Sequence, residues 1–324
     1  MDRFEAMRTL VAAIDGGSLS AASRALNVPL PTVSRRVSDL EAMLGSQLVV
    51  RTSRKLLLTE AGIAYVESAR RVLEELAEAE RAASGEYRAP RGELLVTAPI
   101  LFGQLNVAPI VHDFLNAFPE VTVRLILSDS VIDLVENHVD VAVRIGRLPD
   151  SAMVARRVGE IRWVVCASHE YLERRGEPVE PGELADNDCI AFEGLQRYRE
   201  WPFVDANGST QQARINPRFS INTAEGVTGG AAAGLGIARV LSYQAANGVR
   251  DGKLVPILSD FAPAPMPVQL VHAAHQQQPL KLRAFMDFVA PRLQQRLKAI
   301  ADVYAVKREP IIRVEKGVEE PTKA

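Results

Sequence analysis

Six basic residues lie close together near the start of the chain, and their side chains are suited to binding a polyanion. They are Arg24, Arg35, Arg36, Arg51, Arg54 and Lys55. Only Asp39 and Glu41 oppose them between residues 24 and 55, so this stretch has a net charge of +4. The whole chain has a net charge of −2, which leaves −6 for the remainder. This distribution predicts a basic segment that binds nucleic acid through its phosphates and an acidic remainder with a different task.

Short helices are expected to position these basic side chains. Apolar residues recur every three or four positions over residues 4–15, and a glycine pair ends that helix. A second helix is expected over residues 21–26, capped by Ser18 or Ser20. After a turn at residues 27–30, a third helix is expected over residues 31–44, because proline suits a first turn and glycine follows the last residue.

The third helix is predicted to be the one that enters a DNA groove. Val33, Val37, Leu40 and Leu44 form its inner stripe, and Arg35 and Arg36 lie on the other side with Thr32 and Asp39. A guanidinium can bond guanine O6 and N7 together, so Arg35 is the expected base-reading residue. The predicted DNA contacts are Ser20, Pro31, Thr32, Ser34, Arg35, Arg36, Ser38, Arg51, Arg54 and Lys55. The alternative is a small helical domain with a solvated basic face.

A hairpin and a long helix are expected next. Two short strands at residues 48–51 and 55–59 flank a polar turn, and a helix of about 40 Å follows over residues 60–86. Its apolar residues Ile63, Val66, Leu73, Leu76 and Ala83 have the spacing of a seam between paired helices. A break at residues 89–92 reads as a hinge.

The rest of the chain alternates between strand and helix patterns, which predicts a mainly parallel α/β architecture of two lobes. Strands are expected at residues 94–98, 121–127, 139–145, 162–167, 190–192, 237–240 and 268–273. Helices are expected at residues 105–117, 131–137, 169–175, 224–233 and 280–297. Residues 307–324 are charged and lack an apolar face, so a flexible tail is expected there.

The chain resembles the LysR-type transcriptional regulators over most of its length. The resemblance rests on Gly-Gly-Ser-Leu-Ser-Ala-Ala-Ser at 16–23, Pro-Thr-Val-Ser-Arg-Arg-Val at 31–37 and Leu-Thr-Glu-Ala-Gly at 58–62. It continues through Pro-Arg-Gly-Glu-Leu at 90–94, Asp-Val-Ala-Val-Arg-Ile-Gly at 140–146 and Ala-Ala-Gly-Leu-Gly-Ile-Ala at 232–238, up to about residue 295. Leu30 departs from the pattern, because family members often carry a polar residue there, and a weaker cap of the third helix is expected.

The resemblance implies a multidomain protein. It has an all-α winged helix-turn-helix domain at residues 1–60, a linker and dimerisation helix at 61–88, and an α/β effector domain at 92–295. The last is expected to resemble a periplasmic binding protein, with lobe I at 92–162 and 266–295 and lobe II at 163–265. The implied partners are promoter DNA, a small-molecule effector, RNA polymerase, and copies of the chain in a homodimer or homotetramer.

Effector contacts are predicted where parallel strands end, because ligands bind at the carboxyl ends of strands in open sheets. The predicted residues are Pro99, Ile100, Leu101, Phe102, Ser128, Asp129, Arg144, Gly146, Phe192, Asn222 and Thr223. Free N–H groups at residues 100–102 beside Arg144 would suit an anionic effector. Three alternatives remain: the hydroxyl and amide residues are helix caps, Arg144 pairs with Asp129 or Asp140, and residues 100–102 are core.

Other chemistry is not expected. Cys166 and Cys189 are too few for a disulfide framework, and His272 and His275 lack a third metal ligand nearby. The glycine-rich run at residues 229–236 follows a helix instead of a strand, so no nucleotide loop is expected. We expect no cofactor, no catalysis and no membrane segment, and the absence of an apolar leader predicts a cytoplasmic protein. The rival hypothesis is a small-molecule-binding protein without regulatory DNA binding.

Overall fold

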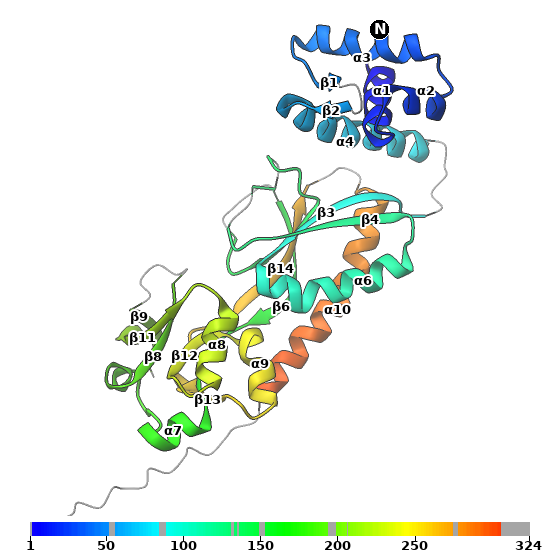
Figure 1. Ribbon diagram of the computed structural model, residues 1–324. Coiled ribbons are helices and arrows are strands. Elements are labelled where there is room, and N and C mark those ends of the chain that lie inside the picture. The colour runs from blue at the N-terminus through cyan, green and yellow to red at the C-terminus, as the bar shows by residue number, and fades with distance from the viewer. Residues whose placement is uncertain are drawn as a thin grey trace, which may run out of the picture. The chain divides into compact units, whose positions relative to one another are not determined.

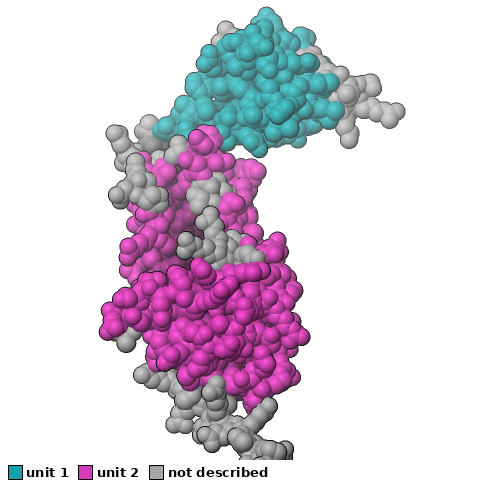
Figure 2. Space-filling model, turned by 90° about the vertical axis from the view of Figure 1, so that its left-hand side faces the viewer, with its two compact units in different colours: residues 1–89 teal, residues 90–324 magenta. Residues whose placement is uncertain are grey.

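The structure is a computed structural model that describes residues 2–51, 56–83, 89–130, 133–134, 136–148, 153–193, 199–205, 207–274 and 278–305. The chain forms two compact units, Met1–Ala89 and Pro90–Ala324 (Figure 2). The predicted hairpin turn with Arg54 and Lys55, the end of the long helix at 84–88 and the tail at 307–324 lie outside the described residues. None of the described helices is long and apolar enough to cross a membrane.

The first unit contains the predicted helices and hairpin (Figure 1). Its elements are α1 (Arg3–Asp15), α2 (Leu19–Leu26), α3 (Leu30–Leu44), β1 (Val49–Arg51), β2 (Leu56–Leu58) and α4 (Glu60–Ala83). Ser18 caps α2 by accepting a hydrogen bond from the Ala21 N–H at 3.1 Å, so Ser20 lies inside the helix. Pro29 precedes α3 without a side-chain cap, in line with the expected weak start of this helix.

The core of this unit corrects two sequence predictions. Val37 and Leu40 of α3 pack with Leu10 and Val66 in one buried cluster, so Val66 belongs to the domain core instead of an open seam. Leu44 was predicted to share the inner stripe of α3, but it is 40% exposed because α3 ends there and Gly45 turns the chain away.

Glu41 fastens the third helix to the hairpin. Its Oε1 accepts hydrogen bonds from the backbone N–H groups of Leu48 and Val49, at 2.8 and 3.0 Å. On the other side of Leu48, a Cβ added to Gly62 would lie 1.9 Å from the Leu48 carbonyl oxygen. The start of β1 is therefore held between α3 and the first turn of α4.

Replacing Glu41 with alanine should destabilise the first unit by about 1–3 kcal/mol, because two partly buried N–H groups lose their acceptor. Denaturant unfolding followed by circular dichroism measures this loss. Asp39→Ala is the matched control, since Asp39 is an exposed acid on the same helix. Equal stability of the two variants would contradict the anchoring role.

The second unit contains two five-stranded mixed sheets. The first has the order β4-β3-β5-β14-β6 and the second β11-β8-β12-β7-β13. Their strands are β3 (Gly92–Ala98), β4 (Val121–Leu127), β5 (Val141–Ile145), β6 (Met153–Ile161), β7 (Trp163–Ala167), β8 (Asp188–Phe192), β11 (Asn216–Ile221), β12 (Ile237–Leu241), β13 (Val255–Ile257) and β14 (Met266–Ala273). In each sheet three neighbouring strands run parallel and the others join antiparallel.

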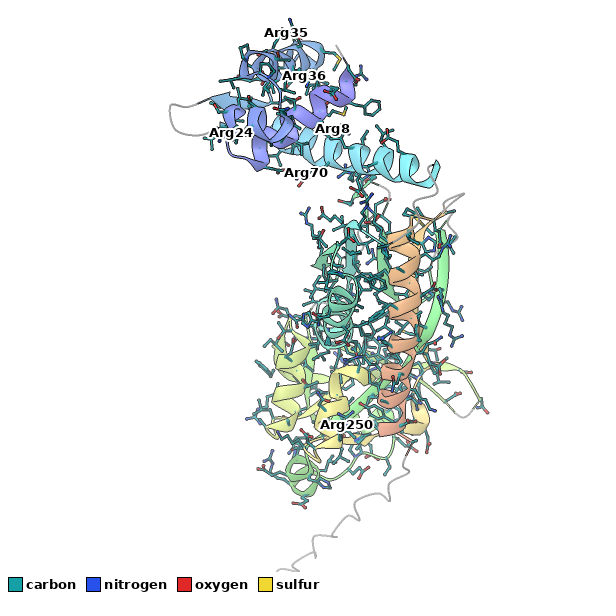
Figure 3. The ribbon with its side chains drawn as sticks, turned by 90° about the vertical axis from the view of Figure 1, so that its right-hand side faces the viewer. Arg8, Arg24, Arg35, Arg36, Arg70 and Arg250 are labelled. Carbon is teal, nitrogen blue, oxygen red and sulfur yellow. The ribbon has the colours of Figure 1, made fainter. Side chains whose placement is uncertain are left out.

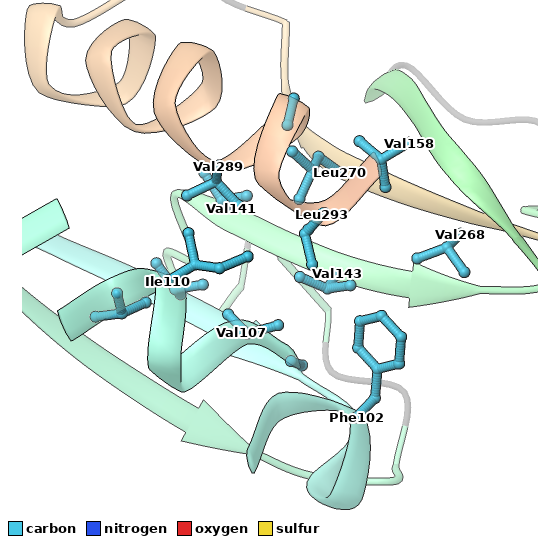
Figure 4. Close-up of a cluster of buried hydrophobic side chains, with 14 of the residues drawn as sticks. Phe102, Val107, Ile110, Val141, Val143, Val158, Val268, Leu270, Val289 and Leu293 are labelled. Atoms are coloured by element: carbon cyan, nitrogen blue, oxygen red, sulfur yellow. The ribbon is translucent and has the colours of Figure 1, made fainter. Parts of the chain in front are cut away.

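Helices cover both sheets. The main ones are α6 (Ala108–Ala117), α7 (His169–Arg175), α8 (Ala224–Ala232), α9 (Ser242–Arg250) and α10 (Leu280–Val303). A three-residue α5 (Ile100–Phe102) and a π-helical turn η1 (Gly103–Val107) lead directly into α6. In the first lobe, Ile110 of α6 and Leu293 of α10 pack with sheet residues such as Val143 (Figure 4). This core fixes the strand ends that carry the predicted site.

Some elements differ from the sequence predictions. A helix was expected at residues 131–137, but the described residues of this segment form turns. Strands β6, β11 and β13 and helix α9 were not predicted. A further hairpin, β9 (Glu200–Val204) with β10 (Thr210–Arg214), was also missed. The prediction of a mainly parallel sheet did not include the one reversed strand of each sheet, β14 and β7, which lies next to an edge strand.

Candidate functional site

Helix α3 carries both Arg35 and Arg36, and their guanidinium groups have different surroundings (Figure 3). Arg35 is exposed and forms no ion pair with any described residue. Arg36 Nη2 instead lies 2.8 Å from Glu5 Oε2 on α1, and Arg36 Nη1 donates to Thr9 Oγ1. The guanidinium of Arg36 therefore has an intramolecular partner in this structure, whereas that of Arg35 has none among the described residues.

Five other predicted DNA contacts have described side chains, and four of them lie on α3 with Arg35. Pro31 and Ser38 are exposed on α3, and Thr32 and Ser34 are half-buried on the same helix. Ser20 is exposed on α2, and Arg51 ends β1. Short polar residues therefore share α3 with Arg35, as the base-contacting residues of a recognition helix do.

The topology of the second unit brings the carboxyl ends of its two sheets together. In the first sheet, β3, β4 and β5 are parallel, and β6 runs in the same direction because β14 is antiparallel to both β5 and β6. The chain passes directly from the end of β6 to β7, which starts at the edge where the antiparallel β12 ends. Strands β8 and β11 end at that same edge. The predicted effector contacts of lobe I and lobe II therefore lie at the two sheet edges that the connection from β6 to β7 joins.

In lobe I, one of the backbone N–H groups that were predicted to be free already has a hydrogen-bond acceptor. The Ile100 N–H donates to Asp129 Oδ1 at 3.0 Å, so a resident carboxylate already caps this helix start. Phe102 is fully buried and contacts Tyr243 edge-on, with ring centroids 5.1 Å apart. The prediction of Phe102 as an effector contact is wrong, because the side chain packs in the core. Ile100 is exposed, and Pro99 and Leu101 are half-buried.

The other strand ends of lobe I carry polar groups. Ser128 Oγ accepts from the Ser130 N–H at 3.1 Å, so this hydroxyl acts locally as a turn cap. Arg144 is half-buried at the end of β5, and burial lowers the pKa of its guanidinium. The next turn contains Gly146, whose φ of +101° favours glycine.

In lobe II, three predicted residues follow the parallel strands. Phe192 ends β8 and packs half-buried against the lobe II core. Asn222 is exposed after β11. Thr223 Oγ1 accepts from the Gly226 N–H at 3.3 Å and caps α8, as the alternative hypothesis anticipated.

Sequence analysis missed Arg239, which lies near the carboxyl end of β12. It is only 7% exposed, and its Nε and Nη2 have no hydrogen-bond partner among the described residues. The guanidinium stacks on Trp163 of β7, 4.0 Å from the ring centroid, and burial lowers its pKa to about 10. An arginine inside the apolar run Ile-Ala-Arg-Val-Leu was the available signal, since an unpaired buried charge is costly.

The two cysteines are buried structural residues. Both are free thiols, and burial raises the pKa of Cys166 and of Cys189 to about 12. Such thiols carry almost no thiolate near neutral pH and react slowly. The described residues contain no group of three or more side chains able to hold a metal ion.

Comparison with known proteins gives two family matches that together span most of the chain. Residues 4–63 match the bacterial regulatory helix-turn-helix protein, lysR family, and residues 88–294 match the LysR substrate binding domain. The chain belongs to the LysR family. This regulator is 33% identical to the HTH-type transcriptional regulator CrgA of Neisseria meningitidis, over 89% of this chain and 96% of that protein.

Solved LysR-type structures have the same overall organisation. The structure of CrgA from Neisseria meningitidis covers 89% of this chain and 98% of its own, with a TM-score of 0.57 at 33% identity. The full-length Vibrio cholerae virulence activator AphB gives a TM-score of 0.56 at 28% identity, over 89% of this chain and 98% of its own. This LysR-type protein is thus a DNA-binding transcriptional regulator with a winged helix-turn-helix and a two-lobed effector domain. The alternative without regulatory DNA binding leaves the first match unexplained.

Proposed function

We propose that α3 enters the major groove of a promoter and that Arg35 reads a base edge there. The guanidinium of Arg35 carries this proposal, because it is exposed and forms no ion pair within the described part of the chain. Ser20, Pro31, Thr32, Ser34 and Ser38 supply neighbouring contacts, while Arg51, Arg54 and Lys55 neutralise the adjacent backbone phosphates. Arg36 contributes less, because a contact with DNA would compete with its ion pair to Glu5.

The regulator acts as an assembly in which α4 pairs with its copy. Val66 and Ala69 of α4 are buried in their own domain, and Leu73 and Leu76 lie seven residues further along the same stripe. Both leucines are half-exposed, so the apolar stripe runs beyond the surface that its own domain covers. A paired helix would cover it and bring two winged domains onto an interrupted palindrome.

A Leu73→Glu, Leu76→Glu double variant should shift the protein toward monomer and weaken promoter binding at least tenfold, because two charges would enter the helix pair. Sedimentation velocity and a gel shift with the DNA upstream of the chain's own gene measure the two effects. Glu75→Gln, on the exposed side of α4, is the matched control. An unchanged sedimentation coefficient would contradict pairing through α4.

The effector binds between the joined strand edges and is an anion. Arg239 supports this assignment, because a buried guanidinium with two unpartnered nitrogens gains charge-assisted bonds from a carboxylate. Arg144 and other residues at or after the strand ends form the surrounding surface; they are Pro99, Ile100, Leu101, Ser128, Asp129, Gly146, Phe192, Asn222 and Thr223. Binding that favours one lobe arrangement over another then shifts the spacing of the DNA-binding pairs.

Five further assignments complete the proposal. The domain limits follow the tasks: residues 1–60 bind DNA, 61–88 pair and 92–295 sense the effector. The assembly is a homodimer or homotetramer, it works in the cytoplasm, and it contacts RNA polymerase at promoters. The regulator has no catalytic activity of its own, a proposal supported by relatives that are named as transcriptional regulators.

A further inference from the structure

A pocket of about 210 Å³ lies where three elements of the effector domain meet. One wall comes from the π-helical turn η1, one from α9 and one from α10. Both lobes thus contribute walls to the pocket, because η1 follows β3 of the first sheet and α9 follows β12 of the second. None of the residues predicted for the effector site lines this pocket, so it is a separate feature.

The inner part of the pocket contains an unsatisfied polar group. The Asn106 side chain lines the pocket, is only 5% exposed, and has an Nδ2 with no hydrogen-bond partner among the described residues. Such a buried amide usually has a partner, because a buried N–H group without an acceptor loses its hydrogen bonds to water and gains none in return. Asn106 lies within the π-helical turn, and turns of this kind often occur at functional sites.

Tyr243 supplies a second polar group beside Asn106. Its hydroxyl accepts a hydrogen bond from Gln244 Nε2 at 3.2 Å, which leaves its own proton to be donated. Burial raises the pKa of Tyr243 to about 12, so the phenol keeps this proton at neutral pH. Asp129 and Glu225 also raise the pKa of this phenol, so its hydroxyl lies within reach of two acids outside the pocket, and the Asn106 amide is the donor that the inner wall offers.

Positive charge surrounds the entrance. Arg250 of α9 and Arg296 of α10 both line the pocket, and none of its described lining residues is acidic. Arg250 Nη1 donates to Asn247 Oδ1 at 2.9 Å, and Arg296 Nη1 donates to the Leu105 carbonyl at 3.3 Å, so both side chains are held in place by neutral acceptors. Figure 3 shows Arg250 beside the lower part of α10.

We propose that this pocket is a second ligand site, which binds a small aliphatic carboxylate. The carboxylate lies between Arg250 and Arg296, and its short apolar body packs on Leu105, Ala246 and Ile300. The pocket is smaller than the roughly 300 Å³ and above typical of sites for drug-sized ligands, so a short chain is the fitting size. A ligand here touches both lobes and α10, and it favours the lobe arrangement in which the three elements meet.

Butyrate binding to the full-length protein, measured by isothermal titration calorimetry at low salt, tests this assignment. Wild type is expected to bind butyrate, with no binding of the uncharged butan-1-ol. The Arg250→Gln, Arg296→Gln double variant should bind at least tenfold more weakly. Ala299→Phe, which fills the pocket without changing its charge, should abolish binding, and Asn106→Leu should weaken it several-fold.

Two controls separate this site from the proposed effector site. Arg292→Gln removes a charge from α10 outside the pocket, where Arg292 stacks on Phe288, and should leave butyrate binding unchanged. Arg239→Met, at the proposed effector site, should also leave it unchanged. The pocket assignment is overturned if wild type does not bind butyrate, or if Ala299→Phe binds it as wild type does. Either result leaves the proposed effector site standing.

Discussion

Arg35→Ala is expected to remove most of the preference of the regulator for its own promoter. A bidentate contact of arginine with guanine provides about 1–3 kcal/mol of discrimination, which corresponds to roughly 5- to 150-fold in affinity. Because each subunit of a pair contributes one such contact, the two losses add to about 2–6 kcal/mol across a palindrome, which corresponds to roughly 30-fold or more. Gel shifts with the promoter and with a scrambled duplex of equal length measure the ratio.

Arg8→Ala is the matched control for this experiment, since Arg8 is an exposed arginine of the same domain but lies on α1 (Figure 3). It should lower affinity for both duplexes slightly and leave their ratio unchanged, as expected for a charge that lies outside the groove. Arg36→Ala should behave like the control, because Arg36 pairs with Glu5. A promoter preference that survives in Arg35→Ala would refute base reading by this residue.

Arg239→Met is expected to have opposite effects on stability and on ligand response. A buried charge without a compensating partner costs several kcal/mol, and Arg239 has none among the described residues, so an apolar side chain of similar size should be stabilising there. The lost contact with Trp163 offsets part of this, since a desolvated cation–π pair contributes about 2 kcal/mol. The net expectation is a free energy of unfolding equal to or above that of wild type, measured by urea denaturation.

The same variant should lose the response to anions. An aromatic carboxylate such as salicylate should raise the melting temperature of wild type, because a ligand that binds only the folded state stabilises it. The shift should disappear in Arg239→Met and persist in Arg214→Met, which removes an exposed arginine from the same lobe. A full shift in Arg239→Met would show that the effector carboxylate pairs elsewhere.

Sequence patterns predicted the winged domain well because its signals are local. Caps, glycine stops and the three- and four-residue apolar spacing all act within a few residues, so α1 and α3 begin and end within one residue of expectation. Helix α9 was missed because Asn247 and Gly248 weaken its pattern, and β6 was missed because much of it is an exposed edge. These elements form through tertiary packing, which overrides local propensity.

The candidate site residues also divide into features that local sequence determines and features that depend on distant residues. Arg35 and the strand ends were identifiable because residue type and position within an element decide their exposure. The pairing of Arg36 with Glu5 joins residues far apart in sequence, and no local pattern encodes it. The Ile100 N–H was predicted to be free for the same reason, because its acceptor Asp129 comes from the end of another strand.

The double hydrogen bond of Glu41 to the start of β1 has a consequence for how the regulator searches DNA. It joins α3 to the start of β1 as a single rigid body, so their relative orientation is set when the domain folds. The entropy of ordering two separate parts is therefore not lost again at each encounter with a duplex. Loosening this joint would slow recognition of every promoter alike, without changing which sequence is preferred.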